Sequence, residues 1–265
     1  MISPLAHIHP EVSIGKNVRI DAFTVIEKNV TIGDDSHVMS NVVIMSNTTI
    51  GKSCTIFPGA VIGAIPQDLK FDGEKTTVEI GDRTTIRECV TINRGTKDKW
   101  KTVIGNDCLL MAYAHIAHDC ELGDHIVIAN AVQLAGHVEI GDYAIIGGLA
   151  AAIQFSKIGS HAYIAGGTEI IKDVPPYVKA GRKPLSYVGI NSVGLQRRGY
   201  TAEKINDILK IYRHIYTYGL NISQAALSIE KDIQDSEEKR NILEFIKNSK
   251  RGILKLVSKE EESNI

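Results

Sequence analysis

The chain has 265 residues, of which 43% are hydrophobic and 23% are charged, and its formal net charge is −1 at pH 7. This length suffices for one elongated domain and a smaller one, and the near-zero charge gives no reason to expect a nucleic-acid partner. No apolar run approaches the roughly eighteen residues of a membrane span. The N-terminus also lacks the pattern of a signal peptide, so we expect a cytoplasmic protein without stable membrane insertion.

A six-residue repeat runs from Ile2 to Ile170. Ile, Val or Leu occupies almost every sixth position, and the exceptions are Asp68, Glu74, Asp98 and Ala152. A period of six fits neither an amphipathic helix nor a plain strand, but it is typical of a parallel β-helix, in which each hexapeptide supplies one short strand and a turn. Three hexapeptides form one triangular coil, so residues 1–176 are predicted to build a prism on the order of 45 Å long.

The repeat is interrupted twice, at residues 64–79 (AIPQDLKFDGEKTTVE) and 94–102 (RGTKDKWKT), and its phase resumes after each interruption. Insertions in repeat proteins tend to lie on one face and to carry binding residues. Plain solvated loops would leave the same pattern. We favour a part in function for the first insertion, and for the second the two interpretations explain the pattern equally well.

Three of the four cysteines, Cys54, Cys108 and Cys120, fall on the small inward position that follows the aliphatic residue by four. Cysteine at such positions behaves as a small hydrophobic residue. Cys89 lies one residue off that position. We interpret all four cysteines as core residues and expect neither a disulfide nor a cysteine metal site.

Residues 177–265 are predicted to form a connector and a C-terminal helical domain, because Pro175 and Pro176 should stop the strand ladder. Hydrophobic residues then recur at helical spacing after Thr201, which is a predicted N-cap; Ser223 and Ser236 are predicted to cap two further helices. The polar tail KEEESNI at 259–265 is expected to fray.

Histidines at outward positions are the leading candidates for chemistry. His118 and His137 are about one coil plus one residue apart, so they should lie near one another, with His115 close by. A neutral imidazole is the usual general base for a hydroxyl group, and the adjacent Asp119 could orient it. Three histidines would also suit zinc, as in the hexapeptide-repeat carbonic anhydrases, and their number leaves this alternative open.

Seven motifs spread along the chain resemble the UDP-N-acetylglucosamine O-acyltransferases that begin lipid A biosynthesis. They are PQDLK at 66–70, EIGDRTTIRECVTINRGT at 79–96, AHIAHDC at 114–120, LAGHVEIGDYAIIGG at 134–148, QF at 154–155, DVPPYV at 173–178 and GLQRRGY at 194–200. The resemblance implies an all-β left-handed parallel β-helix with a C-terminal α-helical domain, assembled as a homotrimer. It also implies transfer of a 3-hydroxyacyl chain from acyl carrier protein to the 3-hydroxyl of UDP-N-acetylglucosamine, without a cofactor.

The same resemblance assigns the catalytic roles. His118 would take the proton from the sugar hydroxyl, and Asp119 would orient the imidazole. The backbone N–H of Gly136 would stabilise the oxyanion that develops on the thioester carbonyl.

The resemblance also implies a set of substrate-binding residues. His115, His137 and Gln154 would contact the sugar and the pantetheine, and Asp68 and Lys70 would reach the substrate from the first insertion. Asn191, Arg197 and Arg198 would bind the nucleotide phosphates or the acidic carrier protein, for which the planar arginine fork is well suited. Gly166 would leave the acyl groove open for a long chain.

Three positions depart from the family pattern. Ile153 and Asn93 stand where the family often has histidine, and Val193 replaces a glutamate near Asn191. These changes bear on nucleotide recognition and not on the proposed base. An N-acyltransferase that acts on a 3-amino UDP-sugar stays open as an alternative, because His118 could deprotonate either acceptor.

Overall fold

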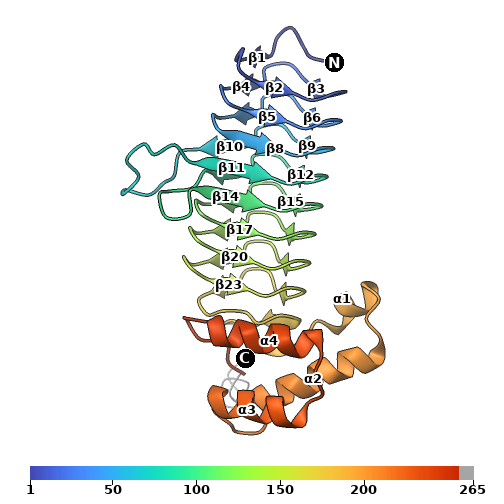
Figure 1. Cartoon of the computed structure of the whole chain (residues 1–265). Coiled ribbons are helices and arrows are strands. Elements are labelled where there is room, and N and C mark those ends of the chain that lie inside the picture. The colour runs from blue at the N-terminus through green and yellow to red at the C-terminus, as the bar shows by residue number, and fades with distance from the viewer. Residues whose placement is uncertain (257–265) are drawn as a thin grey trace.

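The computed structural model describes residues 1–256, which form a triangular prism of short strands followed by four helices (Figure 1). The tail KEEESNI lies outside the described residues. Three parallel sheets form the faces of the prism, and consecutive strands go to successive faces. We call these sheets I, II and III.

Sheet I contains β1 (His7–Ile8), β4 (Val25–Ile26), β7 (Val43–Ile44), β10 (Val61–Ala64), β13 (Thr91–Asn93), β16 (His115–Ile116), β19 (Gln133–Leu134), β22 (Ala151–Ala152) and β25 (Glu169–Ile170). Sheet II contains β2 (Ser13–Ile14), β5 (Thr31–Ile32), β8 (Thr48–Ile50), β11 (Thr77–Ile80), β14 (Lys101–Ile104), β17 (Glu121–Leu122), β20 (Glu139–Ile140) and β23 (Lys157–Ile158). Sheet III contains β3 (Arg19–Ile20), β6 (His37–Val38), β9 (Thr55–Ile56), β12 (Thr85–Ile86), β15 (Leu109–Leu110), β18 (Val127–Ile128), β21 (Ile145–Ile146), β24 (Tyr163–Ile164), β26 (Val178–Gly181) and β27 (Ser186–Ile190).

The aliphatic residue of each hexapeptide fills the core. Ile26, Ile44 and Ile62 are fully buried, and each is the direct partner of the next along sheet I. Burying one such side chain stabilises the fold by about 1.5–3 kcal/mol. Cys54, Cys108 and Cys120 are at most 2% exposed, which confirms their interpretation as core residues. The same interpretation is wrong for Cys89, which is exposed because it takes the left-handed corner position, with a φ of 56°.

Each corner of the prism has one residue in the left-handed backbone region, three positions after the aliphatic residue. Asn17, Asn29 and Asn41, one from each corner, have φ values of 56°, 56° and 59°. Asparagine tolerates this conformation better than most residues. Corner I–II joins sheet I to sheet II, and corners II–III and III–I are named in the same way.

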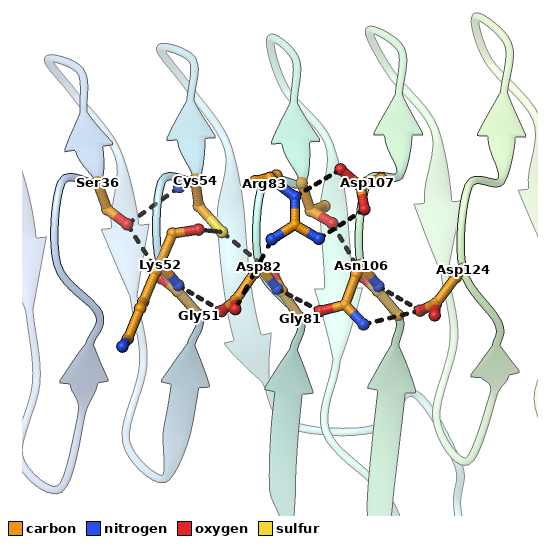
Figure 2. A network of polar contacts seen from close by, with 12 residues as sticks. Ser36, Gly51, Lys52, Cys54, Gly81, Asp82, Arg83, Asn106, Asp107 and Asp124 are labelled. Atoms are coloured by element: carbon orange, nitrogen blue, oxygen red, sulfur yellow. Dashed lines mark hydrogen bonds and ion pairs between the residues drawn. The ribbon is translucent and has the colours of Figure 1, made fainter.

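Corner II–III is closed by a ladder of side-chain acceptors (Figure 2). The backbone N–H of Lys52 donates to Asp82 Oδ1 at 2.7 Å, that of Asp82 donates to Asn106 Oδ1 at 2.8 Å, and that of Asn106 donates to Asp124 Oδ1 at 2.6 Å. The acceptor always lies in the next coil. These bonds satisfy donors that the strand ladder leaves unpaired.

Both insertions leave the prism at corner I–II and project on the same side of it (Figure 1). The first joins β10 to β11 across residues 65–76, and the second joins β13 to β14 across residues 94–100. Both segments are shorter than their predicted ranges, because the strands that follow begin within those ranges. The phase of the repeat is preserved, since β11 and β14 pair along sheet II in register.

The prediction that Pro175 and Pro176 end the strand ladder is wrong for sheet III. Beyond them, β26 pairs in parallel with β24, and β27 pairs antiparallel with β26. The two prolines occupy a turn between Val174 and β26, where no ladder N–H is required.

Four helices follow, α1 (Ser192–Arg197), α2 (Ala202–Tyr216), α3 (Ile222–Asp232) and α4 (Glu237–Asn248), and they cover the C-terminal end of the prism (Figure 1). Thr201 and Ser236 are the N-caps of α2 and α4, as predicted. Ser223 is not a cap, because Asn221 forms a reciprocal capping box with Gln224. Within residues 1–256, none of the helices has the length and apolarity that crossing a bilayer requires.

Candidate active site

Corner I–II brings together four side chains from three successive coils. His118 and Asp119 follow β16, His137 follows β19, and Phe155 follows β22. The rings of His118 and His137 meet edge to face at 5.1 Å, and Phe155 stacks on His137 at 4.4 Å. The predicted proximity of His118 and His137 is therefore confirmed, and both side chains are at least nine-tenths buried.

Asp119 is the centre of the hydrogen-bond network. Its side chain is fully buried, and Oδ2 lies 2.8 Å from Nδ1 of His118. Thr96, in the second insertion, donates its backbone N–H to Oδ1 at 2.9 Å and its hydroxyl to Oδ2 at 2.7 Å. Burial raises the pKa of Asp119, but the hydrogen bonds from His118 and Thr96 outweigh burial and lower the pKa to about 2. Asp119 is therefore a carboxylate at neutral pH.

The contact with Asp119 selects the reactive nitrogen of His118. A carboxylate that accepts from Nδ1 favours the tautomer with the proton on Nδ1, so Nε2 presents its lone pair. The ring packs against Gly136, where an added Cβ would lie 2.5 Å from Cε1, 2.6 Å from Nε2 and 3.0 Å from Nδ1. Gly136 thus gives the imidazole room that an alanine would take.

The N–H of Gly136 has no hydrogen-bond acceptor among residues 1–256. Gly136 packs against the His118 ring on a backbone that is held on both sides, since His137 N–H donates to His118 C=O at 3.0 Å and Phe155 N–H donates to Gly136 C=O at 3.2 Å. A fixed backbone N–H with no partner in the protein is available to an oxyanion.

His137 borders a groove of about 390 Å³ at the same corner, and the lining includes Asp98, Phe155, Lys250 and Arg251. Asp98 Oδ2 lies 3.2 Å from His137 Nδ1, although not in hydrogen-bonding geometry. Burial lowers the pKa of His137, and the nearby Asp119 carboxylate only partly offsets this effect. The groove reaches the imidazole of His137.

His115 does not join the other two histidines. It lies on β16, on the outer face of sheet I, and its Nδ1 is 2.7 Å from the hydroxyl of Thr91. Burial, and next the neighbouring His118, lower its pKa. One chain therefore does not form the three-histidine zinc site that the sequence left open.

Among residues 1–256, the group that could hold a metal ion is instead His118, Asp119 and His137, whose ligand atoms lie within 4.8 Å of one another. The fit is poor. His118 Nδ1 and Asp119 Oδ2 are already bonded to each other, and Oδ2 also accepts from Thr96. A metal ion would have to replace these contacts.

The first insertion carries Asp68 and Lys70. Asp68 Oδ1 accepts from the backbone N–H of Lys70 at 2.9 Å, which shapes the loop, and the Lys70 side chain is exposed. Phe71 lies under the guanidinium of Arg94 at 5.5 Å, so the two insertions contact each other. Lys70 is therefore available to a ligand on the side of the prism that bears His118.

The remaining predicted residues are distributed over the other corners. Asn191 caps α1 and donates to His161 C=O, and Arg198 stacks over Tyr143 and donates to its carbonyl, both at corner II–III. Gly166 is exposed at corner III–I. A single chain does not bring these residues to His118.

Arg197 is exposed at the end of α1, and Gln154 is exposed next to Phe155 with its carbonyl bonded to Arg251 at 2.6 Å. Of the three departures from the family pattern, Asn93 is buried at the end of β13, whereas Ile153 and Val193 are 38% and 57% exposed. The two exposed side chains could contact a ligand, and Asn93 could not do so directly.

Sequence reasoning missed Thr96 and Phe155 as site residues. Both lie in motifs that carry the family resemblance, and Phe155 could have been found from the 18-residue coil, since it follows His137 by one coil. Thr96 had no such signal, because an insertion has no repeat phase.

Comparison with known proteins identifies relatives over almost the whole chain. A family model described as UDP N-acetylglucosamine O-acyltransferase, domain 2, matches residues 173–254, and the bacterial transferase hexapeptide model matches residues 29–64 and 101–136. The acyl-[acyl-carrier-protein]–UDP-N-acetylglucosamine O-acyltransferase of Xylella fastidiosa is 45% identical over 96% of this chain and 98% of its own length. The enzyme of that name from Herminiimonas arsenicoxydans is 44% identical over 96% and 99%.

Solved structures agree with these matches. A UDP-N-acetylglucosamine acyltransferase of Bacteroides fragilis superposes with a TM-score of 0.95 at 50% identity, covering 96% of this chain and 100% of that one. The Arabidopsis enzyme reaches a TM-score of 0.84 at 31% identity, covering 96% and 100%. The predicted fold, a left-handed parallel β-helix with a C-terminal helical domain, is confirmed.

Proposed function

The chain belongs to the family of acyl-[acyl-carrier-protein]–UDP-N-acetylglucosamine O-acyltransferases, and from this we infer that it is such an enzyme. It transfers a 3-hydroxyacyl chain from acyl carrier protein to the 3-hydroxyl of UDP-N-acetylglucosamine, the first step of lipid A biosynthesis. The observation that carries the inference to specific residues is the buried His118–Asp119 pair beside the unpaired N–H of Gly136.

We propose that His118 is the general base. Nε2 takes the proton from the sugar 3-hydroxyl as its oxygen attacks the thioester carbonyl carbon, and the new C–O bond forms as the carbonyl becomes an oxyanion. When the C–S bond breaks, the pantetheine thiolate leaves and receives the proton from the imidazolium. Asp119 keeps the proton on Nδ1 and stabilises the positive ring in between.

The Gly136 N–H is the proposed oxyanion donor. It is aimed by the corner backbone before substrate binds, so it needs no reorganisation when charge develops. Because Gly136 packs against the His118 ring, the imidazole could receive the proton of the sugar hydroxyl while this N–H donates to the thioester oxygen.

The other predicted residues are proposed to hold the substrates. His115, His137 and Gln154 lie at or near corner I–II, where sugar and pantetheine would lie, and Asp68 and Lys70 reach the same side from the first insertion. Asn191, Arg197 and Arg198 would bind nucleotide phosphates or the carrier protein. Gly166 would leave room for a long acyl chain.

The distribution of these residues over three corners supports the proposed homotrimer. If corner I–II of one copy faces another corner of its neighbour, His118 and residues such as Gly166 or Arg198 can line one cleft between two copies. We place the enzyme in the cytoplasm, where its activated sugar and acyl carrier protein are made, and expect no cofactor.

The decisive experiment is an acyl-transfer assay with 3-hydroxyacyl-acyl carrier protein and two acceptors, UDP-N-acetylglucosamine and its analogue with an amine at position 3. We expect an ester product from the first acceptor and slower turnover, or none, with the amine. Turnover confined to the amine would replace the proposal with N-acylation. A requirement for one zinc ion per site, shown by loss of activity on chelation and recovery with zinc, would replace it with metal-dependent chemistry.

A further inference from the structure

The second insertion contacts the carboxylate of Asp119. Of the contacts to that carboxylate, Thr96 supplies two, one to each oxygen, at 2.9 and 2.7 Å. The backbone N–H of Lys99 adds a third, longer contact to Oδ1 at 3.3 Å. The remaining bond, from Oδ2 to His118 Nδ1, is the one that orients the proposed base.

The insertion is fixed where it makes these contacts. Trp100 N–H donates to Thr96 C=O at 2.8 Å, and Arg94 N–H donates to Ala64 C=O at 2.9 Å. Gly95 permits the close return of the chain, since a Cβ there would lie 2.4 Å from Lys101 N. Lys99 Nζ then binds Glu121 and Glu139 on sheet II, at 2.8 and 3.1 Å.

Thr96 is buried, so its hydroxyl donates its hydrogen bond to the Asp119 carboxylate and not to water. Hydrogen bonds to charged groups are about twice as strong as neutral ones. Because the two donors of Thr96 bind one carboxylate oxygen each, they fix the rotation of the carboxylate as well as its position. With that rotation fixed, the direction of Oδ2 toward the imidazole is fixed too.

We propose that Thr96 is a positioning residue for acyl transfer, which holds the Asp119 carboxylate so that Oδ2 stays aimed at His118 Nδ1. The proposal rests on the proposed function, since it assumes that His118 is the base. It differs from a purely structural role for the insertion, because it predicts that the hydroxyl of Thr96 affects the state of the imidazole.

The charged groups that face Asp119 all belong to this one cluster. They are His118 on the same turn and His137 from the next coil, with Nε2 at 3.7 Å. Asp98 and Lys99 of the insertion act on His137 in turn. Replacing the Thr96 hydroxyl by a methyl group leaves all of these charges in place. It removes the bond to Asp119 Oδ2 and a longer one, at 3.3 Å, that the hydroxyl accepts from the backbone N–H of Asp98.

The test compares Thr96→Val, which keeps the shape and the backbone N–H, with Thr96→Ser, which keeps the hydroxyl. Thr84→Val is the matched control, because Thr84 is also buried and lies away from the site. Its hydroxyl also donates one hydrogen bond, to Gly105 C=O at 2.9 Å, and accepts one, from Cys108 N–H at 3.2 Å. We expect kcat to fall about 10- to 100-fold in Thr96→Val with little change in KM. Thr96→Ser and Thr84→Val should retain kcat.

A second readout needs no substrate. Nitrogen-15 NMR of histidine-labelled protein at fixed pH should show His118 in the wild type with its proton on Nδ1, and a mixture of tautomers in Thr96→Val alone. Wild-type kcat in Thr96→Val, an equal loss in Thr96→Ser, or a loss of kcat with the His118 signals unchanged would each overturn the proposal. If the wild type transfers no acyl group to either acceptor, the proposed function fails, whereas the NMR comparison still decides whether Thr96 controls the imidazole.

Discussion

Corners II–III and I–II are built from the same hexapeptide, yet one is closed and the other is open. At corner II–III, the residue two positions after the aliphatic one is Asp82, Asn106 or Asp124, and each accepts the N–H of its counterpart one coil earlier (Figure 2). At corner I–II the same position holds His118, Gly136 and Gln154, and within residues 1–256 the Gly136 N–H is unpaired.

Glycine also changes place between the two corners. At corner II–III it stands one residue after the aliphatic position, as in Gly105 and Gly123, where a Cβ would collide with Asp124 or Asp142 of the following coil. At corner I–II it stands at Gly136, where a Cβ would collide with the ring of His118. In the first case glycine makes room for the acceptor of a stabilising bond, and in the second for the proposed base. The proposed chemistry lies where the stabilising ladder is interrupted.

The largest effect should come from removing the proposed base. His118→Ala should lower kcat by roughly 10²–10⁴-fold, the usual contribution of a general base, while thermal stability and oligomeric state stay close to the wild type. His125→Ala is the control, a histidine at corner II–III whose ring stacks on Tyr143. Steady-state acyl transfer and thermal melts on both variants test this prediction. Equal losses of activity in the two variants would show that His118 has no special part in the reaction.

The next largest loss of activity should come from adding, at corner I–II, a side-chain acceptor like those of corner II–III. Gln154 holds, relative to Gly136, the place that Asp142 holds relative to Asp124, so Gln154→Asp should let a carboxylate accept the Gly136 N–H. Loss of one oxyanion donor costs about 10²–10³-fold in kcat, and the added bond should leave stability unchanged or raised.

Gln154→Ala separates this effect from the loss of the glutamine itself, because alanine removes the side chain without adding an acceptor. The kcat of Gln154→Asp should be far below that of Gln154→Ala. Equal kcat values for the two variants would show that the Gly136 N–H has no part in the reaction.

The part of the fold and of the candidate site that the sequence predicts is the part that the six-residue repeat governs. The phase of the repeat predicts the prism, the buried positions and the contact of His118 with His137. The same phase places Gly166 at a different corner, since Gly166 does not lie a whole number of 18-residue coils from His118. Thr96 could not be predicted, because an insertion folds back by contacts that have no period. Nor could the stacking of Arg198 on Tyr143, which depends on how the connector meets the prism.

A smaller effect concerns acid stability. The pKa of Asp119 is about 2 in the folded protein against an ordinary value of 3.8, so the carboxylate stabilises the fold above about pH 4, and this contribution is lost as the pH falls toward 2. Asp119→Asn should therefore be less stable than the wild type by about 2 kcal/mol at neutral pH. This difference in the free energy of unfolding, the stability gap, should shrink as the pH falls from 4 to 3.

Urea unfolding of both proteins at pH 7, 5, 4 and 3 measures that gap, and carboxylates common to the two proteins cancel in the difference. A gap that stays constant from pH 7 to pH 3 would mean that the network at corner I–II does not stabilise the charged form of Asp119.

The smallest effect should be confined to corner II–III. Asp124 Oδ1 accepts from Asn106 N at 2.6 Å and from Asn106 Nδ2 at 3.0 Å, whereas Asp142 Oδ1 accepts only from Asp124 N at 2.8 Å. Asp124→Ala should therefore lower the free energy of unfolding by about 1–2 kcal/mol and Asp142→Ala by about 1 kcal/mol or less, both with unchanged kcat. Chemical unfolding and the acyl-transfer assay test the two halves of this expectation. A loss of kcat in Asp124→Ala without a loss of stability would show that the closed corner also acts in catalysis, since the bonds removed there have no contact with His118.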